Sequence, residues 1–136
     1  MYARHLKPIL NVADIRESFA WFAKLGWTKN WEWGTPPTFG CVGSGECEIF
    51  LCHQAQGDRR RGALTPLHGF EGSEEVDQGS WVYLMVDDVD AVYRHCQEQG
   101  IEVAWPPTVV PWGVLEMHVR HPDGHVLRIG QASKEA

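Results

Sequence analysis

Hydrophobic and polar positions follow two different periods along this chain, and the order of those periods repeats. Residues 6–12 and 81–86 are short apolar runs typical of buried strands. After each run, apolar side chains recur every three or four residues, which predicts an amphipathic helix. An aspartate cap precedes each helix and a glycine follows it, twelve residues after the cap in both cases: Asp14 with Gly26, and Asp88 with Gly100.

Further strands are predicted after each helix. In the first half they are 38–43 and 46–52, and in the second half 114–120 and 125–130. The unit is therefore β-α-β-β, and a third strand at 27–33 and at 101–105 would extend it to β-α-β-β-β. A double proline follows at matching places, Pro36-Pro37 and Pro106-Pro107. We interpret the pattern as an internal repeat within a single domain, residues 1–136. Repeat one covers about 4–53 and repeat two about 80–131, joined by a linker at 54–79.

The last predicted hairpin contains the most distinctive local chemistry. Its turn, His121-Pro122-Asp123-Gly124, combines a fixed proline φ, an aspartate that bonds its own backbone, and a glycine that accepts positive φ. Just before the hairpin, Pro111-Trp112-Gly113 holds a large indole on a stiff corner. Trp112 either fills the core of its own repeat or forms a platform for a ligand, and the sequence leaves both interpretations open.

Composition narrows the class of protein. The chain is 43% hydrophobic and 22% charged, as globular domains are. No apolar run reaches the ~18 residues of a membrane span, and residues 1–5 lack a secretory signal, so we expect no membrane partner and a cytoplasmic location. The net charge of −6 disfavours nucleic acid and favours a cationic ligand. Free thiols are expected, because none of the four cysteines forms a Cys-x-x-Cys pair: Cys41, Cys47, Cys52 and Cys96.

The repeat and the hairpin together resemble the vicinal oxygen chelate superfamily, which includes glyoxalase I, extradiol dioxygenases and the bleomycin resistance proteins. Pro111-Trp112-Gly113 followed by the turn at 121–124 is most similar to the bleomycin resistance branch. The resemblance implies an α+β fold of tandem β-α-β-β-β repeats forming a curved mixed-sheet cleft in a homodimer. His121 and His125 replace the aspartate and asparagine of the family turn, which puts the hydrogen bonds of that turn in doubt.

Metal-dependent members of the superfamily take His, Gln or Glu ligands from the first and last strands of each repeat. The corresponding positions here are Lys7, Trp81 and Arg128, and only Glu48 among such positions could bind a divalent ion. We therefore expect neither a metal nor another cofactor, and Arg128 could pair with Glu48 instead.

A rival metal set, Glu116 with His118 and His125, lies on the last hairpin. Strand alternation puts residues 116 and 118 on one side, but we expect these three to be surface polar residues of a half-exposed strand. Cys52 and His53 are adjacent and point to opposite faces, so they form no catalytic dyad. No catalytic residue is assigned.

Tryptophan is the residue in excess, with seven in 136. We expect Trp21, Trp27 and Trp81 in the core. In the bleomycin resistance branch an aromatic of the first repeat and the Pro-Trp-Gly tryptophan enclose a planar part of the drug. Carried over, this pair is Phe39 and Trp112, from one chain or from two. The candidate ligand-binding residues are Trp112, Phe39, Trp31, Trp33, Gly113, Cys52 and Glu48.

Three functions remain open. The first is metal-independent sequestration of a planar, cationic small molecule such as a bleomycin-family antibiotic, with antibiotic resistance as its consequence. The alternative is a superfamily enzyme, a glyoxalase-like lyase or a dioxygenase, with an unrecognised metal or catalytic site. The third is a scaffold or regulatory module whose cleft has lost its ligand.

Overall fold

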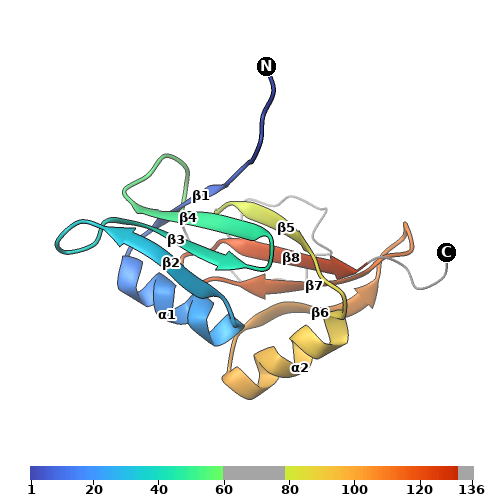
Figure 1. Ribbon diagram of the computed structural model, residues 1–136. Helices are drawn as coiled ribbons and strands as arrows, with labels where there is room; N and C mark the ends of the chain where they lie inside the picture. The colour runs from blue at the N-terminus through green and yellow to red at the C-terminus, as the bar shows by residue number, and fades with distance from the viewer. Residues whose placement is uncertain (60–78, 132–136) are drawn as a thin grey trace. The chain divides into compact units, whose positions relative to one another are not determined.

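The computed structural model describes residues 1–59 and 79–131 of the chain. The chain divides into two compact units, Met1–Asp58 and Arg59–Ala136, and the boundary falls within the predicted linker. The first unit consists of β1 (Ile9–Val12), α1 (Ile15–Leu25), β2 (Thr28–Trp33), β3 (Phe39–Ser44) and β4 (Cys47–His53). The second consists of β5 (Trp81–Met85), α2 (Val89–Gln99), β6 (Val103–Val109), β7 (Leu115–Arg120) and β8 (Val126–Gln131) (Figure 1).

The two units share one topology. Strand order is β1-β4-β3-β2 in the first sheet and β5-β8-β7-β6 in the second. The first and last strands of each unit pair in parallel, and the other pairs are antiparallel. The predicted α+β fold with mixed sheets and tandem β-α-β-β-β repeats is confirmed, including the third strand after each helix. Strand β6 runs beyond the predicted 101–105, through the double proline to Val109.

Both helices begin and end as the sequence predicts. The Asp14 carboxylate accepts hydrogen bonds from the backbone N–H groups of Arg16 and Glu17, at 3.0 and 3.2 Å. Asp88 accepts from the N–H of Ala91 at 3.1 Å. Gly26 and Gly100 end the helices in the left-handed conformation, at φ 98° and 69°. These caps satisfy backbone groups that a helix end leaves without intrahelical partners.

Each unit has a core on the face of its sheet that carries the helix. Fully buried side chains of the first core are Leu10, Val12, Phe22, Ile49 and Leu51. Those of the second are Val89, Cys96, Met117, Val119 and Leu127. Alternation along a strand places the next residues on the opposite face, which we call the open face of each sheet.

The tryptophans expected in the core are divided. Trp21 is buried and packs edge-on against Phe22, with ring centroids 4.9 Å apart. Trp27 is partly buried. The prediction for Trp81 was wrong, because 41% of this side chain is exposed. Trp81 begins an edge strand and belongs to its open face, which the apolar run 81–86 could not reveal.

Candidate functional site

Aromatic side chains from three strands gather on the open face of the first sheet. Trp31, Phe39 and Phe50, which we call the aromatic triad, have ring centroids 5.3 to 5.5 Å apart. The register explains this meeting, since Cys41 on β3 pairs with Trp31 on one side and with Phe50 on the other. Trp31 remains 39% exposed, so the triad presents ring surface outward.

Two further predicted residues extend this face. Phe39 pairs with Trp33 on β2 and with Cys52 on β4, so all three lie in one cross-strand row. Trp33 is 69% exposed, whereas Cys52 is half-buried. The sequence prediction missed Phe50, although alternation in β4 places it on the same face as Glu48 and Cys52.

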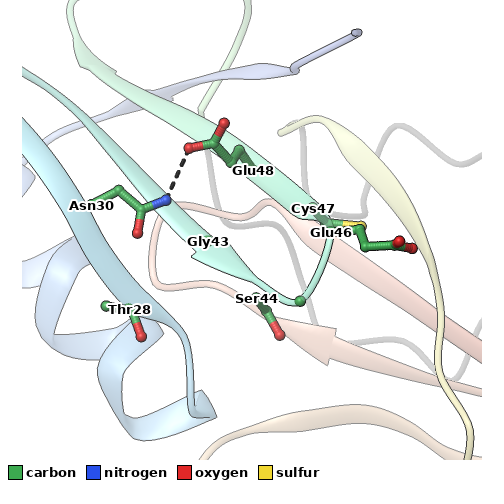
Figure 2. A pocket seen from close by; sticks show the side chains of 8 residues that line it. Thr28, Asn30, Gly43, Ser44, Glu46, Cys47 and Glu48 are labelled. Carbon is green, nitrogen blue, oxygen red and sulfur yellow. Dashed lines mark hydrogen bonds between the residues drawn. The ribbon is translucent and has the colours of Figure 1, made fainter.

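Glu48 forms the polar end of this face. Its Oε2 accepts from the Asn30 amide at 2.9 Å (Figure 2) and from the Cys41 thiol at 3.0 Å. Its Oε1 lies 3.3 Å from the Lys7 ammonium. These hydrogen bonds, the one from Cys41 foremost, lower the pKa of Glu48 to about 2. Lys7 also lies over the Phe50 ring, 5.8 Å from its centroid. The carboxylate is thus fixed and already paired with a cation of the chain.

The same arrangement makes Cys41 a poor nucleophile. Burial, and then the hydrogen bond to Glu48, raise the pKa of its thiol to about 11. A thiolate, rather than a thiol, is the reactive species. Cys41 therefore serves as a hydrogen-bond donor to the carboxylate at neutral pH.

A polar cavity of about 400 Å³ lies beside Glu48 at the turn between β3 and β4 (Figure 2). It is lined by Thr28, Asn30, Gly43, Ser44, Gly45, Glu46, Cys47 and Glu48. Of the predicted ligand-binding residues it contains Glu48 alone. Glu48 thus lines the cavity and lies on the same face of the sheet as the aromatic triad.

Trp112 and Gly113 belong to the second unit. The Gly113 N–H donates to the Val110 carbonyl at 2.8 Å, and Gly113 adopts φ 85°, so the corner is a tight turn that needs glycine. Trp112 is 56% exposed. Exposure of this size shows that Trp112 is not a plug of its own core, and its role as a platform for a ligand stays a prediction. The pairing of Phe39 with Trp112, which lie in different units, stays a prediction.

The prediction that Glu116, His118 and His125 are surface residues was wrong. Their exposed fractions are 0%, 4% and 0%. Alternation correctly put residues 116 and 118 on one side of the strand, but it could not show that aromatic rings lie against His118. Trp105 and Trp81 contact His118, with ring centroids 4.8 and 6.4 Å away.

Arg128 pairs with Glu116, a carboxylate of its own unit. The Glu116 Oε2 accepts from Arg128 Nε at 2.9 Å and from Nη2 at 2.8 Å. His118 Nε2 lies 2.8 Å from the same oxygen. Burial lowers the pKa of His118, and the Arg128 charge lowers it further, against the opposing effect of Glu116. Within the units, Lys7 is the cation beside Glu48 and Arg128 is the cation beside Glu116. The suggested pairing of Arg128 with Glu48 joins residues of different units and stays a prediction.

These contacts leave the rival metal set incomplete. His125 Nδ1 accepts the Ser80 N–H at 2.9 Å and so stands apart from the other two. Within residues 1–59 and 79–131, no group of three or more His, Cys, Asp or Glu side chains could hold a metal ion. No helix in the described part of the chain is long and apolar enough to cross a membrane.

The two β-α-β-β-β units define the fold class of this protein, and sequence comparison gives its family. A sequence model of the Glyoxalase/Bleomycin resistance protein/Dioxygenase superfamily matches residues 4–129. The chain belongs to this superfamily. No protein of curated function matches the sequence significantly.

Several solved structures share the fold at low identity. A bleomycin-binding protein complexed with bleomycin is 19% identical, with a TM-score of 0.70 over 96% of this chain and 100% of that one. A bleomycin resistance determinant encoded on the transposon Tn5 is also 19% identical, with a TM-score of 0.70 over 97% and 99%. TioX from Micromonospora sp. ML1 is 16% identical, with a TM-score of 0.72 over 95% and 98%.

Proposed function

We propose that this protein binds and sequesters a planar, cationic small molecule of the bleomycin antibiotic class, without a metal and without chemical conversion. The aromatic triad on the open face of the first sheet is the observation that carries the proposal. A conjugated ring stacked there gains roughly 0.5–1.5 kcal/mol per aromatic pair beyond burial. The exposed ring of Trp33 adds a surface that can accept a cation, and the net charge of −6 favours one.

Two ion pairs support the metal-independent part of the proposal. Lys7 pairs with Glu48 on the open face of the first sheet, and Arg128 pairs with Glu116 on the open face of the second, so both carboxylates already have a positive partner. A divalent ion would have to displace these cations. The proposed binding therefore depends on ring stacking and hydrogen bonds, the usual means of recognition in small-molecule sites.

The proposal includes a second wall and a second chain. Trp112, held outward by its turn, would cover the ligand from the other side, with Phe39 as its counterpart. We further propose that the protein acts in the cytoplasm as a homodimer, where tight stoichiometric capture would confer resistance. Support for drug capture and resistance comes from the related structures, which are described as a bleomycin-binding protein and a bleomycin resistance determinant.

Titration with metal-free bleomycin tests the proposal. We expect quenching of tryptophan fluorescence at micromolar drug, and calorimetry should show that Phe39→Ala and Trp112→Ala each weaken binding about tenfold. Phe19→Ala is the matched control, because Phe19 packs over Gly40 on the helix side of the same sheet. Absence of binding at micromolar drug, or equal losses in Phe39→Ala and Phe19→Ala, would contradict it.

A further inference from the structure

On the open face of the second sheet, the position next to a buried carboxylate has no side chain of its own. In one cross-strand row Gly130 separates Met85 on β5 from Glu116 on β7. Gly130 has no side chain, and the phenol of Tyr83 occupies that space: a Cβ at this position would collide with the Tyr83 hydroxyl. Tyr83 itself is 46% exposed, so its ring can turn toward solvent.

Glu116 uses only one of its two carboxylate oxygens. Oε2 takes both Arg128 contacts and the His118 contact, as described above. Oε1 is buried and has no hydrogen-bond partner among the residues that the structure describes. A buried acceptor without a donor is costly, and a charged one more so than a neutral one. This oxygen marks a place where a donor from outside the chain would be stabilising.

Charge balance defines the kind of donor. Arg128 offsets the charge of Glu116, and burial lowers the pKa of His118. Because the Glu116–Arg128 pair is neutral overall, a charged ligand group would lose its hydration with little net electrostatic gain. An uncharged N–H group is less costly to bury and supplies the missing hydrogen bond.

The surroundings favour a flat ring as the carrier of that N–H group. Along β5 the side chains of Trp81, Tyr83 and Met85 are 41%, 46% and 61% exposed. The Arg128 guanidinium lies 5.6 Å from the centroid of the Trp81 ring and 5.9 Å from that of Tyr83. These exposed aromatic and thioether groups form an apolar surface for a ligand ring, and the one buried acceptor, Glu116 Oε1, would fix the orientation of that ring.

We propose that the second sheet binds a neutral planar ring bearing a carboxamide or amino group, whose N–H donates to Glu116 Oε1. Tyr83 turns away from Gly130 to admit the group, and the ring lies against Trp81. The residues of this proposed site all belong to the second unit and do not include Trp112, whereas the drug titration above is tested through Phe39 and Trp112. The failure of this site and the failure of the proposed function can therefore be told apart.

Three small probes with the same ring test the donor and the charge. In ¹H–¹⁵N spectra of the full chain, benzamide should shift the Trp81 indole N–H in a saturable way. N,N-dimethylbenzamide lacks the N–H group and should bind about tenfold more weakly, as should cationic benzamidine. Equal affinity for benzamide and its dimethyl derivative would overturn the proposal, as would tighter binding of benzamidine or shifts confined to the first unit.

Two substitutions test whether the Glu116 carboxylate causes the preference for benzamide over its dimethyl derivative. Glu116→Gln should abolish the preference for benzamide over the dimethyl compound, because an amide N–H₂ would stand at the acceptor position. The matched control Glu102→Gln changes another ion-paired glutamate of this unit, 3.2 Å from Arg120, and should leave the preference intact. If Glu116→Gln does not fold, Trp81→Ala, at a half-exposed position, should weaken benzamide about fivefold. An unchanged preference in folded Glu116→Gln, or unchanged affinity in Trp81→Ala, would overturn the proposal.

Discussion

Glu48 and Glu116 are both carboxylates on an open face, yet their surroundings give them different properties. Glu48 is partly exposed and both of its oxygens have partners, Lys7 on one and Asn30 with Cys41 on the other. Glu116 is fully buried and all of its partners share one oxygen. The first carboxylate is therefore saturated, whereas the second can still accept a donor.

The low pKa of Glu48 predicts how the free energy of unfolding changes as pH falls. Its folded value of about 2 lies below the ordinary 4.5, so the unfolded chain takes up the proton first as pH falls. Its contribution to the free energy of unfolding is complete above about pH 4.5 and is lost as pH falls toward 2. Glu48→Gln should thus be less stable at pH 7 and show a shallower decline over that interval.

Urea unfolding at several pH values between 7 and 2 measures this difference. Glu46→Gln, which changes an exposed glutamate two residues away, is the control and should follow the wild-type profile. Parallel profiles for wild type and Glu48→Gln would mean that the hydrogen bonds from Cys41 and Asn30 do not stabilise the folded state.

At the scale of elements, sequence pattern predicted most of the fold. Helix limits followed from aspartate caps and left-handed glycines, and the strands followed from apolar runs. Alternation also put Trp31 and Trp33 on one face, whereas the strand register that adds Phe39 and Cys52 to it appears only in the structure. Alternation failed where neighbours in space decide exposure: Trp81 starts an apolar run yet is exposed, while Glu116 is polar yet buried. One strand's sequence contains no information on which rings will cover it.

At the scale of elements, the aspartate N-caps of the helices predict a measurable loss of stability when one is removed. Asp88→Ala removes the hydrogen bond to the Ala91 N–H and should lower the free energy of unfolding by about 1 kcal/mol. Chemical denaturation measures the loss, and Asp87→Ala, which changes the exposed residue before the cap, should cause a much smaller one. If the two variants lose equal stability, charge near the helix start is the cause, rather than the cap.

At the scale of the whole molecule, the two units share one topology but differ in what their open faces hold. The first presents a cluster of tilted and edge-to-face aromatic rings beside the Lys7–Glu48 ion pair, and the second presents Glu116, with one unsatisfied oxygen, beside exposed rings. Large apolar side chains remain exposed in both, among them Trp33 and Trp112. Exposed apolar surface of this kind is frequently covered by a partner.

The proposed homodimer is tested by light scattering during gel filtration. We expect twice the chain mass of 15.4 kDa, because association would cover exposed indoles. Trp33→Ser should shift the mass toward a single chain if that indole lies in the interface. A single-chain mass for wild type at every concentration would contradict the dimer while leaving ligand binding within one chain possible.

The distribution of thiols has a practical consequence. Cys41 and Cys96 are buried, and Cys52 is half-buried with its thiol near the His53 carbonyl. Cys47 alone of the four is exposed, and it lies on the rim of the polar cavity next to Glu48. The natural chain thus contains its own attachment point for an environment-sensitive dye. A fluorophore linked there would report events at the cavity mouth without any engineered cysteine.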